Sequence, residues 1–202
     1  MVKKYDYIII GQGIAGSTLA WNLYFKNKTF LILDSENNNS ASKAALGIYN
    51  PITGRRKALT WNLHKVFKGL EKFYTRVEKN IGIKILFKKD IHRPFKNNTD
   101  WNDWNIRLSN QNFQKIVKSI DDKKVITKMS GYVNVKKYLT QTRKYFKSNN
   151  RYNKYKLNDK NIVIKNNEIR LNGYYAKHIV MCMGIDQKKI NFFNKLDIKE
   201  VS

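Results

Sequence analysis

The 202-residue sequence predicts an α/β fold, and three observations near its N-terminus support this prediction. Residues 5–10 form a short β-branched run closed by glycine, which is typical of a buried strand. The glycine-spaced segment 11–16 then opens an amphipathic helix. Residues 29–33 form a second buried strand that ends at Asp34, which completes a βαβ unit of ordinary length. The residues expected on the buried face of the helix are Ala15, Leu19 and Leu23.

Helices and strands are expected to alternate after this unit. An apolar stripe predicts a long helix that ends at Gly82. The residues of this stripe are Leu59, Leu63, Val66, Leu70, Phe73 and Val77. Strands are predicted at 83–87 and 91–94, and the polar stretch 97–112 carries no predicted element. A short helix is predicted from Phe113, Ile116, Val117 and Ile120.

The last third of the chain is expected to return to a buried helix and then to strands. Asn134 is a candidate N-cap for the helix, whose buried side is expected to hold Tyr138, Leu139, Thr142, Tyr145 and Phe146. Two short strands flank the turn 166–167, and Asn172-Gly173 is a strong hairpin signal. A final buried strand is expected at 179–183, closed by Gly184.

The composition is strongly basic, with a formal net charge of +25. Such a charge attracts nucleic acids, anionic membranes or acidic partners. Lysine, asparagine, isoleucine, tyrosine and phenylalanine are all abundant, however, and they share A/T-rich codons. The lysines also form no dense block in the sequence. We therefore favour codon bias over a nucleic-acid role as the origin of the charge.

Cysteine use and hydropathy predict a cytoplasmic protein without a membrane partner. The single cysteine, Cys182, excludes an intramolecular disulfide and fits a reducing compartment. The apolar run at 7–10 is too short for a signal peptide. No run approaches the roughly eighteen apolar residues that a membrane span requires.

The segment 11–16 reads Gly-Gln-Gly-Ile-Ala-Gly and predicts dinucleotide binding, because a strand precedes it, a helix follows it, and an acidic residue ends the next strand. Gly11 permits the tight turn, Gly13 lets a pyrophosphate approach the backbone, and Gly16 lets the helix pack on the strand. The helix N-terminus attracts the phosphates, and Asp34 accepts hydrogen bonds from the ribose. The expected contact residues are Gly11, Gly13, Ile14, Ala15, Gly16, Asp34 and Ser35.

The segment 40–51 favours FAD over NAD. It resembles the flavin-contacting stretch of the D-amino-acid oxidase and glycine oxidase superfamily, in which a serine-rich loop leads into small residues. A flat ring against the backbone needs small side chains, although an ordinary small-residue loop remains the alternative. The strand closed by Gly184 is similar to a late strand of that family that passes near the cofactor. The resemblance implies FAD contacts at Ser42, Lys43, Ala44, Ala45, Gly47, Met183 and Gly184.

The resemblance also implies a domain organisation. It implies a Rossmann-type FAD-binding domain with an inserted, incomplete α+β substrate domain. FAD-binding segments are expected at 1–80 and 131–202, and the partial substrate domain at 81–130. Asp34 stands where many family members have glutamate, which still allows contact with a ribose. The sequence ends at Ser202, well short of the family's length, so we expect a truncated chain that lacks the C-terminal part of the family fold.

The function implied is FAD-dependent oxidation of a C–N bond in a small amine or amino acid. A hydride passes to the flavin and water hydrolyses the imine, so no catalytic residue is assigned. Arg55 and Arg56 are candidates for binding a substrate carboxylate, and no metal site is expected. Two alternatives remain: a tRNA-modifying flavoenzyme of the same superfamily, with tRNA as partner, and a non-catalytic FAD-binding remnant.

Overall fold

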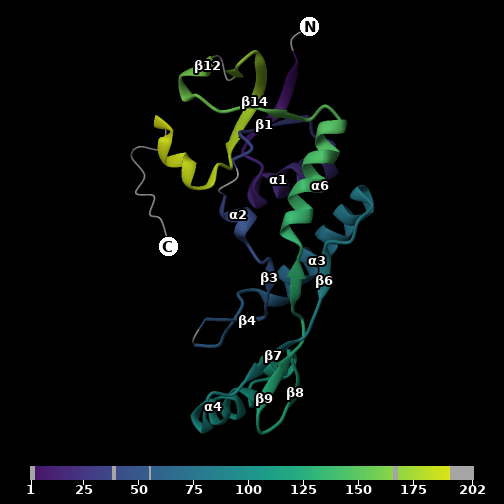
Figure 1. The fold of residues 1–202 in the computed structure, drawn as a ribbon, viewed down its shortest axis with the longest axis vertical. Coiled ribbons are helices and arrows are strands. Elements are labelled where there is room, and N and C mark those ends of the chain that lie inside the picture. The colour runs from purple at the N-terminus through teal and green to yellow at the C-terminus, as the bar shows by residue number, and fades with distance from the viewer. Residues whose placement is uncertain (1–2, 38–39, 55, 166–167, 192–202) are drawn as a thin grey trace. The chain divides into compact units, whose positions relative to one another are not determined.

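The chain divides into two compact units in a computed structural model that describes residues 3–37, 40–54, 56–165 and 168–191 (Figure 1). Unit 1 comprises residues 1–45 and 135–202, and unit 2 comprises residues 46–134. Unit 2 is therefore inserted between the two segments that build unit 1. The sequence placed residues 46–80 with the FAD-binding segment, whereas in the structure they cluster with unit 2.

Unit 1 is built on one six-stranded sheet in the order β11-β2-β1-β14-β13-β12. The first four of these strands run parallel, and β13 and β12 continue the sheet antiparallel. Their bounds are β1 (Lys4–Ile10), β2 (Phe30–Asp34), β11 (Tyr152–Lys154), β12 (Ile162–Lys165), β13 (Glu168–Leu171) and β14 (Tyr174–Met181). The predicted α/β class and the βαβ unit are confirmed.

The central strand β1 pairs with β2 on one side and with β14 on the other. The apolar run Ile8–Ile10 is almost completely buried, as expected for a parallel strand covered on both faces. Helices α1 (Ile14–Phe25) and α6 (Val135–Ser148) pack together through aromatic side chains. The ring centroids of Trp21 and Phe146 are 4.7 Å apart, and the indole N–H of Trp21 donates to Thr142 Oγ1 at 2.9 Å.

The buried face of α1 differs from the predicted one. Ala15 is exposed and Leu19 is only half-buried. The buried residues are Gly16, Ser17, Ala20, Trp21 and Leu23. The prediction omitted Trp21 and the small residues, yet the small residues let the helix lie close to the sheet. The buried side of α6 is confirmed apart from Tyr145, which is half-buried.

The hairpin at Asn172-Gly173 is confirmed, because β13 and β14 pair across it and both turn residues have positive φ, 46° and 81°. The final strand β14 ends at Met181, so Met183 and Gly184 lie after it at the start of a 3₁₀ helix, η2 (Gly184–Lys189). The predicted turn at 166–167 lies outside the described residues. A short helix, α2 (Ala41–Ala44), occupies the start of the segment 40–51, where a serine-rich loop was expected.

Unit 2 contains three small antiparallel sheets and three helices. The sheets have the orders β3-β10-β6, β7-β9-β8 and β4-β5. The bounds are β3 (Ile48–Tyr49), β4 (Ile52–Thr53), β5 (Ala58–Leu59), β6 (Leu86–Lys88), β7 (Ile91–Pro94), β8 (Val117–Ile120), β9 (Lys124–Thr127), β10 (Gly131–Val133), α3 (Leu63–Ile81), α4 (Asn98–Leu108) and α5 (Gln111–Gln114).

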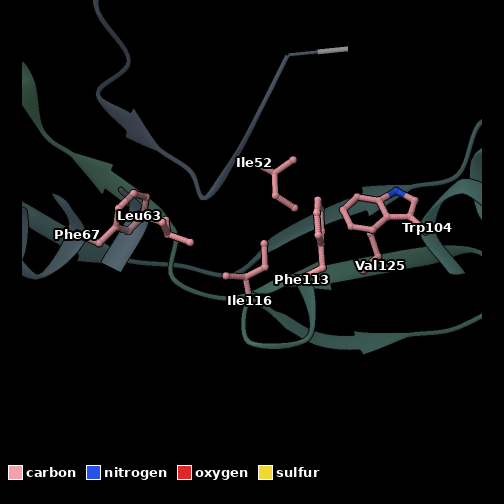
Figure 2. Packing of buried hydrophobic residues seen from close by; sticks show 7 residues of the cluster. All are labelled: Ile52, Leu63, Phe67, Trp104, Phe113, Ile116 and Val125. Atoms are coloured by element: carbon pink, nitrogen blue, oxygen red, sulfur yellow. The ribbon is translucent and has the colours of Figure 1, made fainter. Parts of the chain in front are cut away.

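One hydrophobic cluster joins these elements of unit 2 (Figure 2). Its residues come from β4, from the first turns of α3, from α4, α5 and β9, and from the position directly before β8. They are Ile52, Leu63, Phe67, Trp104, Phe113, Ile116 and Val125. Because α3 contributes Leu63 and Phe67 to this cluster, burial of its apolar face explains why the helix belongs to unit 2.

Several predictions in unit 2 were wrong in detail. The long helix begins at Leu63, since Leu59 lies in β5, and Val66 is 40% exposed. The polar stretch 97–112 contains α4, whose Trp104 is in the core. Val117 and Ile120 belong to strand β8 instead of a helix. Gly82 does end α3, in the left-handed conformation with φ of 69°. Over the part of the chain that the structure describes, no helix is long and apolar enough to cross a membrane.

Candidate functional site

A pocket opens in unit 1 where the carboxyl ends of the parallel strands β1, β2 and β14 meet the start of α1. This edge of a parallel sheet is where nucleotides commonly bind. Eight of the residues predicted to contact a cofactor line the pocket: Gly11, Gly13, Asp34, Ser35, Ser42, Lys43, Met183 and Gly184. The structure therefore brings together residues from both segments of unit 1.

The turn between β1 and α1 requires glycine at its first and last positions. Gly11 has φ of 97°, and a Cβ there would lie 2.4 Å from the carbonyl oxygen of Cys182. A Cβ on Gly16 would lie 1.9 Å from the carbonyl oxygen of Gly11. Both distances are far below van der Waals contact, so these two glycines are fixed by packing of the backbone, as the sequence predicted for Gly16.

The N-terminus of α1 faces Ser42 of α2. The backbone N–H of Ile14 donates to Ser42 Oγ at 3.1 Å, and a Cβ on Gly13 would lie 2.9 Å from the same oxygen. Unpaired N–H groups and the partial positive charge of a helix N-terminus favour an anion. The first turn of α1 carries no acidic side chain that would oppose one. This end of the pocket can therefore hold a phosphate group beside the Ser42 hydroxyl.

Asp34 is held in place by four donors, two backbone N–H groups and the side chains of Tyr152 and Arg143. Its Oδ1 accepts from the backbone N–H of Gln12 at 2.8 Å. Its Oδ2 accepts from the backbone N–H of Glu36 at 3.0 Å, the Tyr152 hydroxyl at 3.3 Å and the Arg143 guanidinium at 3.4 Å. Among the described residues Oδ2 faces three donors and Oδ1 one, so Oδ1 has room to accept a hydrogen bond from a ribose hydroxyl.

Sequence reasoning missed Gln12 and Arg143. Gln12 is 3% exposed, and its amide nitrogen donates to Ser17 Oγ and to the carbonyl of Leu139, both at 2.9 Å. Its Oε1 accepts from Arg143 Nε at 2.9 Å. The residue between the first two glycines of the motif thus joins α1 to α6. The sequence carried no signal for this pair, because its members are 131 positions apart.

Burial raises the pKa of two side chains in this region, which favours their protonated forms. Burial raises the pKa of the Tyr152 phenol, and the neighbouring carboxylate of Asp34 raises it further. Tyr152 therefore remains a donor, and its hydroxyl contacts Glu36 Oε1 at 3.0 Å. Burial also raises the pKa of the Cys182 thiol, which lines the pocket. The side chain of Cys182 is half-buried.

The remaining predicted residues are not among those that line the pocket. Ile14 contributes its backbone N–H, and Ala15, Ala44 and Ala45 are exposed in unit 1. Gly47 belongs to unit 2, where its carbonyl accepts from the backbone N–H of Val133 at 2.9 Å. Arg56 is exposed in unit 2, and Arg55 lies outside the described residues. The cofactor and substrate roles of all these residues stay predictions. No group of three or more potential metal ligands occurs among the described side chains.

Comparison with known proteins reveals a shared fold. No family model matches the chain. Glycine oxidase from Geobacillus kaustophilus superposes over 93% of this chain and 57% of its own, with a TM-score of 0.69 at 14% identity. L-amino acid deaminase from Proteus vulgaris covers 98% of this chain and 51% of its own, with a TM-score of 0.66 at 14% identity. L-proline dehydrogenase from P. horikoshii covers 98% and 58%, with a TM-score of 0.61 at 14% identity. The chain therefore has the fold seen in these amino-acid oxidoreductases, and it spans little more than half of their length.

Proposed function

We propose that unit 1 binds FAD and that the chain belongs to an oxidoreductase acting on a C–N bond of a small amine or amino acid. One observation carries the nucleotide part of this proposal. The Gly11–Gly13 turn, the N-terminus of α1 with Ser42, and the fixed carboxylate of Asp34 line the same pocket at the edge of the parallel sheet. This is the set of groups that a dinucleotide requires.

Two lines of support favour FAD over NAD. The small-residue segment 40–51 resembles the flavin-contacting stretch of the D-amino-acid oxidase superfamily. In addition, the solved structures that share the fold are named for oxidation or deamination of amino acids. The residues present fit the group, because Ala44 and Ala45 are small and exposed in unit 1, whose pocket also includes Lys43.

Three side chains of the pocket, those of Ser42, Asp34 and Arg143, then have a role in holding the cofactor. The Ser42 hydroxyl and the first N–H groups of α1 bind the pyrophosphate, and Asp34 Oδ1 accepts from the adenosine ribose. The guanidinium of Arg143 offsets the negative charge of Asp34 beside those phosphates. Bound FAD supplies the acceptor for the hydride that leaves the carbon bearing the amine. No residue of this chain is assigned as catalytic.

The first test is retention of FAD by the purified chain through gel filtration, read from the visible absorption bands of oxidised flavin. We expect the wild-type chain to retain FAD. Asp34→Asn should weaken FAD binding at least about ten-fold, because a hydrogen bond to a charged group contributes about 1.5–3 kcal/mol. Asp122→Asn, at an exposed position of unit 2, serves as the matched control. A chain that retains no added FAD, or that binds NAD in its place, contradicts the proposal.

The reaction requires a separate test on chain that has retained FAD. Anaerobic addition of glycine, L-proline or other small amino acids and amines should bleach the flavin bands if one of them is a substrate. Retention of FAD without bleaching by any of these compounds would favour the alternative of a non-catalytic FAD-binding module.

A further inference from the structure

The long helix α3 of unit 2 carries a row of cationic side chains along one face. Successive members are three, four, four and three residues apart, and all are exposed: Lys65, Lys68, Lys72, Arg76 and Lys79. At about 100° per residue these positions fall within an arc of about 80°. At about 1.5 Å per residue the row is about 21 Å long. We refer to these five residues as the cationic face.

The two carboxylates of α3 point to other partners. Glu78 Oε1 accepts from the backbone N–H groups of Ile85 and Leu86, both at 2.7 Å. Glu71 pairs with Lys88 Nζ at 2.8 Å. At 100° per residue both acidic positions fall outside the arc of the cationic face. The two carboxylates of the helix therefore contact the strand β6 and the residue before it.

No other residue of the helix falls within this arc, and Gly69 and Thr75 flank it, each about 20° beyond one edge. A Cβ on Gly69 would have no atom within 4 Å, so packing does not explain a glycine in the middle of this helix. Glycine is unfavourable in a helix interior, and one of its uses is to let a ligand approach the backbone closely. The opposite side of α3 is anchored by the buried residues Leu63, Phe67 and Val77, which hold the cationic face in a fixed position.

We propose that the cationic face of α3 binds the phosphate backbone of duplex RNA. Phosphate binding needs only cations, and it carries the salt-dependent part of nucleic-acid affinity. A membrane-bound helix would present apolar side chains between its cations, and a protein interface would present aromatic or aliphatic anchors. The cationic face has neither.

RNA is favoured over DNA because of how each duplex is recognised. Sequence-specific proteins read DNA with side chains that form paired hydrogen bonds to base edges in the major groove. Duplex RNA is recognised by its shape and by its phosphates and 2′-hydroxyls across a wide, shallow minor groove. Four of the five cations are lysines, which act as point charges and suit phosphate contacts. This inference is independent of the flavin site in unit 1.

The test is a fluorescence-anisotropy titration of a labelled RNA hairpin with the full chain at several salt concentrations. The variant combines Lys65→Gln, Lys68→Gln and Lys72→Gln. We expect its RNA affinity to fall at least about ten-fold at low salt. The slope of log affinity against log salt should decrease by about 3, one for each phosphate contact removed.

The matched control combines Lys136→Gln, Lys144→Gln and Lys147→Gln, which remove the same charge from exposed positions of α6 in unit 1. The control should keep the wild-type salt slope. Equal weakening in both triple variants would show that net charge alone attracts RNA and would overturn the proposal. The proposal also fails if the wild-type chain does not bind the hairpin, or if it binds a DNA duplex of the same sequence or anionic vesicles more tightly.

Discussion

At the residue scale, Arg143 connects two polar side chains of the pocket, those of Gln12 and Asp34. Its Nε donates to Gln12 and its terminal nitrogen donates to Asp34, and 28% of its side chain is exposed. Arg143→Gln should leave the Asp34 carboxylate without its cation and weaken FAD binding by about 1–3 kcal/mol. The measurement is the Kd for FAD together with the free energy of unfolding in urea.

Lys144→Gln provides the control for this change, because Lys144 is the exposed neighbour of Arg143 on α6. It should alter neither quantity. If Arg143→Gln lowers stability but leaves the Kd unchanged, Arg143 supports the fold only, and its assigned part in nucleotide binding is wrong.

The alkylation rate of Cys182 can report whether the pocket is occupied, because Cys182 is the single cysteine of the chain and lines the pocket. Burial raises its pKa above the ordinary value of 9.0, so the reactive thiolate is scarcer at neutral pH than in a free thiol. Alkylation by iodoacetamide should therefore be slow at pH 7.5 and should accelerate through and beyond pH 9.0. Bound FAD should slow it further, as followed by mass spectrometry.

The urea-denatured chain is the reference for this experiment and should react at the rate of an ordinary thiol. Native alkylation as fast as in the denatured chain would mean that Cys182 is not shielded. Alkylation unaffected by saturating FAD would mean that FAD occupies a different part of unit 1.

The candidate site was predictable from sequence only where its determinants are local. Gly11, Gly13 and Asp34 follow from the spacing of one βαβ unit, and the structure places all three in the pocket. Gln12 and Arg143 were not predictable, because their hydrogen bond depends on how α6 returns to α1 after the whole of unit 2. Side chains that act through such distant contacts leave no periodic pattern in the sequence.

At the scale of elements, strands and helices with buried apolar residues were predicted well, and half-buried elements were not. Strands β1 and β2 are continuous apolar runs, and α6 has a clear apolar side. Strand β11 was not predicted, because it consists only of Tyr-Asn-Lys and is defined by its pairing with β2. The cationic face of α3 was not predicted from the sequence for a related reason. Its lysines are scattered along the sequence and come together only on the helix surface.

Gly69 gives the element-scale prediction. Gly69→Ala should stabilise α3 by about 0.5–1 kcal/mol, because alanine is the better helix former and its Cβ meets no atom here. If RNA lies against this face, the same change should weaken RNA binding. Urea unfolding and the anisotropy titration measure the two effects separately. A gain in stability with unchanged RNA affinity would exclude close approach of RNA at Gly69.

At the scale of the whole molecule, each unit has a self-contained core. The sheet of unit 1 takes every strand from residues 1–45 and 135–202. One hydrophobic cluster on this sheet is likewise confined to that unit and consists of Ile8, Ile10, Leu31, Leu33, Leu171 and Ala176. The cluster of Figure 2 lies entirely within unit 2. The inserted unit therefore interrupts unit 1 in sequence without contributing to its sheet.

Removal of unit 2 tests this division. Replacing residues 46–134 by a short Gly/Ser linker should leave a cooperatively folding unit 1, because α2 and α6, which the linker joins, already contact each other. Circular dichroism and urea unfolding report the fold, and FAD retention reports the pocket, whose lining comes from unit 1 alone. Residues 1–134 provide the contrasting variant. They keep β1 and β2 but lose β14, the other neighbour of β1, and should not fold as unit 1. If the linked variant is also unfolded, unit 1 depends on unit 2 for its stability.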